Sequence, residues 1–298
     1  MPEPASHDDV VTALRAAGCV YAEEEAAHLI EAAGPGGDLA TLVQRRVDGE
    51  PLEWIVGWAW FGDSELRIGV RPGVFVPRRQ TALVAEIAFD LLPRRHGPGT
   101  IVDLCCGTGA IAFQLQDYVP SEQFYLVDID PEAVACAREN VEEFHVDGFP
   151  DPIVLQGDLF DALPDDLRGN VDMITANTPY VPTEEIRLLP AEARAHEPLH
   201  TLDGGPDGLA LLRRIALGAK DWLVVGGGLV IEISDRQIEQ AVAAFEDGGL
   251  VSWWVRATDD EGDYIGTLVA GRYVRPESFE RYLARKDEID PSQRDLWK

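Results

Sequence analysis

Four stretches of the sequence place polar or glycine residues directly after short apolar runs that have the pattern of buried strands. The glycine-rich stretch DLCCGTGAIA spans residues 103–112, and VDID spans 127–130. GDLF follows at 157–160 and NTPY at 177–180. Ligands of parallel sheets bind beyond the carboxyl ends of the strands. These four stretches are therefore the candidate binding residues.

The first three stretches together favour a ligand that contains adenosine. Gly107 and Gly109 let the backbone approach a ligand at a helix start. Asp128 can accept hydrogen bonds from both ribose hydroxyls, and Asp158 can accept one from an adenine amino group. Each carboxylate could instead cap the helix that follows it. With Asp103 there are three carboxylates at successive strand ends beside a glycine turn, and this combination favours the nucleoside.

Asp103, which closes the strand before the glycine turn, distinguishes two classes of cofactor. A dinucleotide-binding turn would have the GxGxxG pattern and would meet a pyrophosphate. This turn instead begins with an acidic residue and has Ala112 near its end. A carboxylate suits a ligand with a cationic end, such as the ammonium and sulfonium groups of S-adenosylmethionine. The residues therefore predict this methyl donor, with S-adenosylhomocysteine as its product.

The fourth stretch has the residue types needed to hold a planar nitrogen in line with that methyl group. The side-chain oxygen of Asn177 and the main-chain carbonyl of Thr178 can each accept an N–H hydrogen bond. Pro179 restricts the backbone, and the Tyr180 ring can pack on the planar group. Catalysis would then depend on positioning and electrostatics, without a dedicated general base. Taken alone, the same four residues could form an ordinary turn.

With these residues identified, the chain resembles the protein-(glutamine-N5) methyltransferases of the HemK/PrmC type over roughly residues 8–273. Members of this family methylate the glutamine of the Gly-Gly-Gln motif in peptide chain release factors. The resemblance rests on the stretches above taken in series, together with EPLEWIVG (50–57), GVFVPRRQT (73–81), HEPLHTLDGGPDGL (196–209) and EISDRQ (232–237).

The resemblance implies a role for each matching residue. Asn177, Pro179 and Tyr180 are implied to be catalytic. The cofactor contacts implied are Asp103, Cys105, Gly107, Thr108, Gly109, Asp128, Ile129, Asp158, Leu159 and Asn177. The substrate contacts implied are Phe75 and Pro77 of a linker that closes over the site, Asn177, Thr178, Pro179 and Tyr180, and Glu197 of a later Glu-Pro motif. No metal ligand is implied.

Three features depart from the family pattern. Thr178 stands where the family has the first of two prolines, and Cys105 stands where it has glycine. The family segment Pro-Arg-Pro-Glu-Thr-Glu is Pro-Arg-Arg-Gln-Thr-Ala at residues 77–82. These departures keep the methyl acceptor open between a release factor, another protein and a small molecule. A nucleic-acid base as acceptor, and a binding protein without catalysis, are further alternatives.

The pattern of apolar residues predicts where the elements that position these residues lie. Helical spacing over 8–33 and 39–47 predicts a small helical domain in residues 1–50, followed by a β-hairpin linker in 51–80 with its hairpin pattern at 54–67. Strands and helices then alternate, which predicts an α/β, doubly wound, mostly parallel sheet in residues 81–275. The resemblance implies a seven-stranded, Rossmann-like methyltransferase domain and a substrate-recognising helical domain. Residues 276–298 are predicted to form a short helix and a tail.

Composition sets the remaining limits. The 298 residues include 25 Lys and Arg against 53 Asp and Glu, a formal net charge of −28. Such a charge repels nucleic-acid backbones, so we expect a protein partner, by resemblance a release factor, and no direct nucleic-acid binding. The four cysteines, two of them adjacent, have no CxxC spacing, which argues against a zinc site or a disulfide framework. We expect no signal peptide, no membrane span and a cytoplasmic location.

Overall fold

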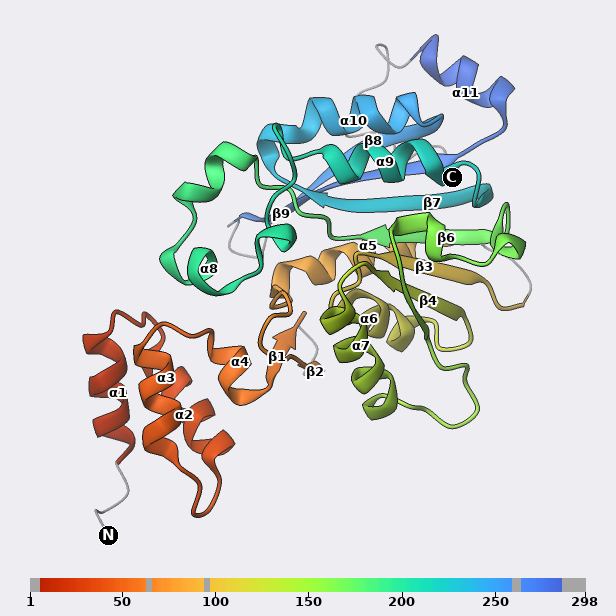
Figure 1. The fold of residues 1–298 in the computed structure, drawn as a ribbon. Coiled ribbons are helices and arrows are strands. Elements are labelled where there is room, and N and C mark those ends of the chain that lie inside the picture. Colours follow the sequence, from red (N-terminus) through yellow and green to blue (C-terminus); the bar gives the residue numbers. More distant parts are fainter. Residues whose placement is uncertain (1–5, 63–65, 94–96, 259–263, 286–298) are drawn as a thin grey trace.

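The computed structural model describes residues 6–62, 66–93, 97–258 and 264–285. Figure 1 shows a group of helices at the N-terminal end, set apart from a sheet that has helices on both faces. The sheet has seven strands in the order β5-β4-β3-β6-β7-β9-β8. The predicted doubly wound α/β fold is therefore confirmed.

The N-terminal helices form a small core of their own. Helix α1 (His7–Ala16) begins with a capping box in which Ser6 and Asp9 bond reciprocally. It packs with α2 (Ala22–Ala33) and α3 (Leu39–Val47) around apolar side chains at helical spacing. These helices match the predicted spans. Arg46 of α3 pairs with Glu25 at 2.6 Å and with Glu192 at 2.9 Å, and Glu192 belongs to α8 (Ala191–His196) beside the sheet.

A short helix, α4 (Leu52–Val56), occupies part of the segment where the hairpin pattern was expected to begin. The sequence pattern predicts a strand at the buried Trp54 and Ile55, because five residues are too few to show helical periodicity. Gly57, at φ 85°, ends the helix in the left-handed conformation. The hairpin itself, β1 (Trp58–Phe61) and β2 (Leu66–Gly69), is antiparallel. The turn expected at 62–63 extends beyond the described residues.

The order of the strands places two strand ends side by side. Strands β3 (Thr100–Leu104), β4 (Gln123–Asp128) and β5 (Ile153–Gln156) extend the sheet in one direction. The chain then returns, and β6 (Val171–Ala176) pairs in parallel on the other side of β3. Such a reversal of strand order creates a crevice at the carboxyl ends of the two strands.

The other edge of the sheet is antiparallel. Strand β7 (Leu223–Ile233) runs parallel to β6, and β9 (Tyr264–Tyr273) lies antiparallel between β7 and β8 (Leu250–Thr258). The sequence pattern predicts that the preceding helix extends to residue 224, but this helix, α9 (Ala210–Ala219), ends five residues earlier. The apolar run 223–225 looks helical in sequence, and it instead begins β7 because Leu223 pairs with Val171. Tertiary pairing here overrides local propensity.

Side chains that alternate along the strands form two separate cores. In β3, Ile101 faces one core and Val102 the other. In β6, Met173 faces the first core and Ile174 the second. The helices on the first face are α5 (Ala82–Leu91), α6 (Ala110–Tyr118) and α7 (Pro131–Glu143), and those on the second are α9 (Ala210–Ala219) and α10 (Ile238–Asp247).

Further elements lie after β6 and at the end of the described chain. Residues 183–201 contain two 3-10 turns and α8, which the sequence pattern did not predict. Helix α11 (Pro276–Leu283) is the short helix expected there, and residues 286–298 of the expected tail lie outside the described part. In the described residues, no helix combines the length and the apolarity that crossing a membrane requires.

Asn140 of α7 connects the hairpin to the glycine turn. Its side-chain Nδ2 donates to the carbonyls of Gly69 at 3.0 Å and Thr108 at 2.9 Å, while its Oδ1 accepts from the Gly69 N–H at 3.0 Å. The side chain is only 3% exposed, so these backbone groups have little access to water. One buried amide therefore fixes β2 against the loop that follows β3.

Replacing Asn140 by alanine should lower the free energy of unfolding by about 2–4 kcal/mol, because three partly or fully buried backbone groups each lose a hydrogen bond. Urea denaturation followed by circular dichroism measures this loss. Glu143→Ala, at an exposed position of the same helix, is the matched control and should change the free energy by less than about 0.5 kcal/mol. Equal effects of the two substitutions would contradict the connecting role of Asn140.

Candidate active site

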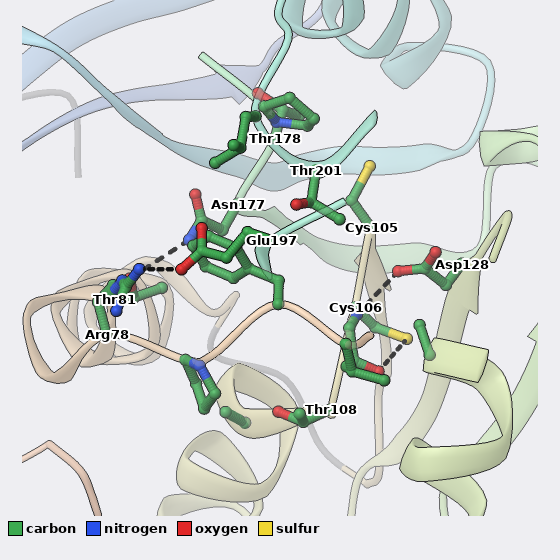
Figure 2. A pocket seen from close by; sticks show the side chains of 18 of the residues that line it. Arg78, Thr81, Cys105, Cys106, Thr108, Asp128, Asn177, Thr178, Glu197 and Thr201 are labelled. Atoms are coloured by element: carbon green, nitrogen blue, oxygen red, sulfur yellow. Dashed lines mark hydrogen bonds and ion pairs between the residues drawn. The ribbon is translucent and has the colours of Figure 1, made fainter. Parts of the chain in front are cut away.

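A pocket of about 440 Å³ lies at the crevice where β3 and β6 end side by side. The register pairs Leu104 with Ala176, so the next residues, Cys105 and Asn177, enter the pocket from adjacent strands. Residues of the loops after β3, β4 and β6 line it, together with residues of segments 74–81 and 189–202. Figure 2 shows Asn177, Arg78 and Glu197 on one side of the pocket and Asp128 on the other.

The turn after β3 adopts the left-handed conformation at three positions. These are Cys105 at φ 56°, Gly107 at φ 57° and Gly109 at φ 84°. A Cβ at Gly109 would lie 2.7 Å from a ring carbon of Phe113 and 2.8 Å from a methyl carbon of Leu126, so only glycine fits there. Cys105 has a side chain in a conformation that costs about 1–3 kcal/mol. The turn thus keeps its shape where the family has glycine, at the cost of local strain.

Asp128, at the end of β4, holds the glycine turn in place. Its Oδ2 accepts the N–H of Gly107 at 2.8 Å, and its Oδ1 accepts the N–H of Asp130 at 2.9 Å. Burial raises the pKa of this carboxyl, while the two backbone hydrogen bonds oppose the rise. A carboxylate has about four lone-pair sites, so Asp128 keeps acceptor capacity for hydroxyl groups in the pocket.

Asp103 lies beneath the turn and is 1% exposed. Its Oδ1 accepts the hydroxyl of Thr175 at 2.8 Å, but Oδ2 has no hydrogen-bond partner among the described residues. Burial raises the pKa of Asp103 to about 7; the Thr175 hydrogen bond opposes this rise and the charge of Asp128 adds to it. A buried acceptor without a partner is unfavourable, and a bound cation or N–H donor would satisfy it.

The Asn-Thr-Pro-Tyr corner after β6 is held by hydrogen bonds and by close packing of two glycines. The Nε2 of Gln237 donates to the main-chain carbonyl of Tyr180 at 2.8 Å. Gly204 and Gly208 pack against the corner so closely that an added Cβ would lie 2.5 Å from the carbonyl oxygen of Pro179 and 2.2 Å from that of Tyr180. The Nδ2 of Asn177 donates to the hydroxyl of Thr81 at 3.3 Å, so its Oδ1 is free of this contact. The corner is therefore a fixed part of the pocket wall.

Arg78 and Glu197 form an ion pair on the same side of the pocket, as Figure 2 shows. The guanidinium lies 5.3 Å from the ring centre of Phe75, which together with Pro77 contributes apolar surface from the linker. Burial raises the pKa of Glu197, and the charge of Arg78 opposes the rise. The Oε2 atom of Glu197 is buried without a hydrogen-bond partner in the described structure. It is an acceptor that could bind an N–H group.

Most of the residues singled out in the sequence meet in this one pocket. Its lining includes Phe75, Pro77, Cys105, Gly107, Thr108, Asp128, Ile129, Asn177, Thr178, Pro179, Tyr180 and Glu197. The described lining does not include the other expected cofactor contacts, Asp103, Gly109, Asp158 and Leu159. Asp158 pairs with Arg214 at 2.9 Å, so its contact with an adenine stays a prediction.

Several pocket residues were not predicted from the sequence. Thr81 is one. Its hydroxyl donates to Glu232 of β7, which is 151 positions away in the sequence, so no local pattern indicates the contact. His200 is another; its Nε2 lies 2.9 Å from Oδ2 of Asp130, across 70 positions. The matching stretches 73–81 and 196–209 contained both residues. The signal that could have found them was the clustering of polar residues in these two stretches.

Comparisons with known proteins show similarity in sequence and in fold. The family model described as "Methyltransferase small domain" matches residues 65–197. A release factor glutamine methyltransferase of Streptomyces coelicolor is 38% identical over 73% of this chain and 74% of its own length. A 4-amino-L-phenylalanine/4-methylamino-L-phenylalanine methyltransferase of Streptomyces pristinaespiralis is 33% identical over 77% of this chain and 76% of its own. A solved methyltransferase from Pyrococcus furiosus shares the fold, with a TM-score of 0.52 at 15% identity, over 72% of this chain and 91% of that one.

The fold and the family match define an enzyme, an S-adenosylmethionine-dependent methyltransferase. Within that class, the identity and coverage of the first relative place the chain in one family. It belongs to the release factor glutamine methyltransferases, which confirms the resemblance drawn from the motifs.

The pKa of Asp103 predicts how stability depends on pH. A carboxyl whose pKa is about 7 in the folded state and near 3.8 when unfolded binds more protons in the folded state between these values. The free energy of unfolding should therefore fall as pH rises from about 4 to about 7, by up to roughly 1.4 kcal/mol for each step of one in pH. Urea denaturation at several pH values measures this slope.

Asp103→Asn removes the titrating group and keeps the shape of the side chain. The difference in unfolding free energy, variant minus wild type, should therefore increase steadily across this pH window. A difference that is constant from pH 4 to pH 7 would show that Asp103 is not the group responsible.

Proposed function

We propose that this enzyme transfers a methyl group to the side-chain amide nitrogen of a protein glutamine, with the Gly-Gly-Gln motif of a peptide chain release factor as substrate. The observation that carries the proposal is the single pocket shared by the glycine turn and the Asn-Thr-Pro-Tyr corner. A methyl donor on the first and an acceptor nitrogen on the second would lie next to each other. The names of the most similar relatives support the choice of glutamine.

The chain has groups that fit S-adenosylmethionine. We assign Gly107 and Thr108 to backbone contact with the donor, and Asp128 to its ribose hydroxyls. The buried Oδ2 of Asp103, which lacks a partner among the described residues, suits its cationic end. Ile129 is 60% exposed at the pocket and offers an apolar surface to the adenine ring. When bound, this cofactor supplies an electrophilic methyl group.

The corner after β6 orients the acceptor. Asn177 Oδ1 and the carbonyl of Thr178 accept the two N–H bonds of the substrate amide, which directs the nitrogen lone pair toward the methyl donor. Accepting these bonds also increases the electron density on nitrogen as positive charge develops there. Pro179 and Tyr180 confine the planar group. Positioning two reactants in this way accounts for much of the barrier reduction in methyl transfer, and the proton leaves to water afterwards.

The parts of the chain outside the pocket contribute to recognition. We assign residues 1–50 to contact with the protein substrate, 51–80 to a linker over the site, 81–275 to catalysis and 276–298 to a terminal helix and tail. Phe75, Pro77 and Glu197 line the pocket, and we assign them to contact with the substrate. The charge of −28 suits a basic protein partner better than a nucleic acid, and a release factor substrate implies a cytoplasmic enzyme.

The test is incubation of the purified protein with labelled S-adenosylmethionine and the release factors of the same organism. Methylation of the glutamine in the Gly-Gly-Gln peptide, located by mass spectrometry, is the expected result. Asn177→Ala is the negative control. Release factors that stay unlabelled under conditions where the protein binds S-adenosylmethionine would overturn the substrate assignment.

A second candidate acceptor is a small aromatic amine. One specific observation favours it: a relative of similar coverage is named for 4-amino-L-phenylalanine, so this family likeness extends to an enzyme with such a substrate. Thr178, in place of a family proline, and the apolar Phe75 are the pocket features that could admit a ring. Adding 4-amino-L-phenylalanine to the same assay separates the two. Turnover of the amine without turnover of the peptide would favour this candidate.

Two substitutions should separate binding of the donor from transfer of the methyl group. Asn177→Ala removes the acceptor for the substrate N–H, so turnover should fall at least about a hundredfold while donor affinity stays within about twofold. Asp128→Ala should instead weaken donor binding by about 1.5–3 kcal/mol, the worth of charge-assisted hydrogen bonds. Calorimetry and steady-state kinetics measure both. Persistent turnover in the Asn177 variant would rule out this assignment of the acceptor site.

A further inference from the structure

Glu232 is a buried carboxylate next to the proposed acceptor site, and none of the proposed roles uses it. It lies near the carboxyl end of β7 and is 4% exposed. The hydroxyl of Thr81 donates to its Oε2 at 2.7 Å. Burial raises the pKa of this carboxyl, while hydrogen bonds from Thr81, Gln80 and Tyr180 and the charge of Arg78 oppose the rise and favour the ionised form. Four residues around the pocket therefore converge on one acid.

The chain of hydrogen bonds from Glu232 to Asn177 has only one consistent direction when the acid is ionised. A carboxylate accepts and cannot donate, so the single hydroxyl proton of Thr81 points to Glu232. The Thr81 oxygen must then accept its second bond, and the group 3.3 Å away must be the NH₂ end of Asn177. The other end of that amide, Oδ1, is therefore the end left for the pocket.

We propose that Glu232, acting through Thr81, is a positioning residue that fixes which end of the Asn177 amide faces the substrate. The two ends of an amide have the same shape and opposite hydrogen-bonding character. With the NH₂ end in the pocket, Asn177 would oppose a substrate amide with a donor. With Oδ1 there, it accepts the N–H of the nitrogen to be methylated. This inference rests on the proposed function, because it concerns the same acceptor site.

The local sequence agrees with this role for Glu232. The side-chain amide of Gln80, the residue before Thr81, donates to Glu232. A carboxylate at position 80 would instead place two acids together at a buried site, which favours protonation of one of them. A protonated Glu232 could donate to the Thr81 hydroxyl, which could then donate to Asn177, so the orientation of the Asn177 amide would no longer be fixed. Tyr180 adds a third donor, which connects the same acid to the opposite side of the corner.

The test compares Thr81→Val with Thr81→Ser and Glu232→Gln. Valine keeps the shape of threonine and removes the hydroxyl, so kcat should fall about tenfold to a hundredfold, while the affinity for S-adenosylhomocysteine stays within about twofold. Serine keeps the hydroxyl and should recover most of the rate lost in the valine variant. Glu232→Gln can donate to Thr81, so kcat should fall by a similar factor. Thermal denaturation of each variant identifies any general loss of stability.

The double variant Thr81→Val/Glu232→Gln provides a stricter criterion. We call the hydrogen-bonded series from Glu232 through Thr81 to Asn177 the relay. If Glu232 acts on Asn177 only through Thr81, the second substitution should add less than about threefold to the loss in kcat, because the first has already broken the relay. Fully multiplicative losses would overturn the relay. So would a serine variant no more active than the valine variant, since side-chain packing alone would then explain the effect.

The inference can fail separately from the proposed function. Wild-type activity on the Gly-Gly-Gln peptide is measured first, and its absence counts against the proposed substrate only. Neutron diffraction structures of the wild type and of Thr81→Val, in which hydrogens distinguish the NH₂ end of an amide from its oxygen, then test the relay without any acceptor. We expect Asn177 in one orientation in the wild type and in more than one in the variant. An Asn177 side chain with the same single orientation and the same hydrogen-bond pattern in both would overturn the relay.

Discussion

The constraint on which the rest of the structure depends is the parallel pairing of β3 with β6. This pairing joins two strands that are separated in sequence by β4 and β5, and its register sets Leu104 beside Ala176. Everything that follows each strand then starts from the same edge of the sheet. A shift of the register by one residue would move the glycine turn relative to the Asn-Thr-Pro-Tyr corner and reverse which face each side chain occupies. The two halves of the pocket would no longer face each other.

The polar groups around this edge are held by a few buried side chains that each satisfy several others. Asn140 connects the hairpin to the glycine turn, Gln237 holds the corner after β6, and Glu232 receives hydrogen bonds from the linker and the corner. Such contacts are directional, so they fix orientation as well as distance. Methyl transfer needs both, because the nitrogen lone pair and the methyl group must be collinear. The fold supplies distance through strand register and orientation through these side chains.

The sequence was sufficient to predict the fold and part of the pocket lining, and the reasons are physical. Buried strands and amphipathic helices have periodic patterns, and ligands of such sheets bind at known edges, so Asp128 and Asn177 could be found directly. The helix at 52–56 was too short to show a period, and the apolar start of β7 resembled a helix until its pairing with Val171 was seen. Thr81 and Glu232 are 151 positions apart, and no local pattern predicts that they meet.

Two carboxylate oxygens in or beneath the pocket, Asp103 Oδ2 and Glu197 Oε2, are buried without partners among the described residues. Burial raises the pKa of both carboxyl groups, because the charged form loses its contact with water. A ligand that brings a cation or an N–H donor removes this penalty, so it gains affinity from an unfavourable feature that the folded protein already contains. Asp103 lies beside the turn assigned to the donor, and Glu197 lies on the side assigned to the acceptor. The same unfavourable feature, beneath the turn assigned to the donor and beside the site assigned to the acceptor, would therefore favour the binding of each reactant.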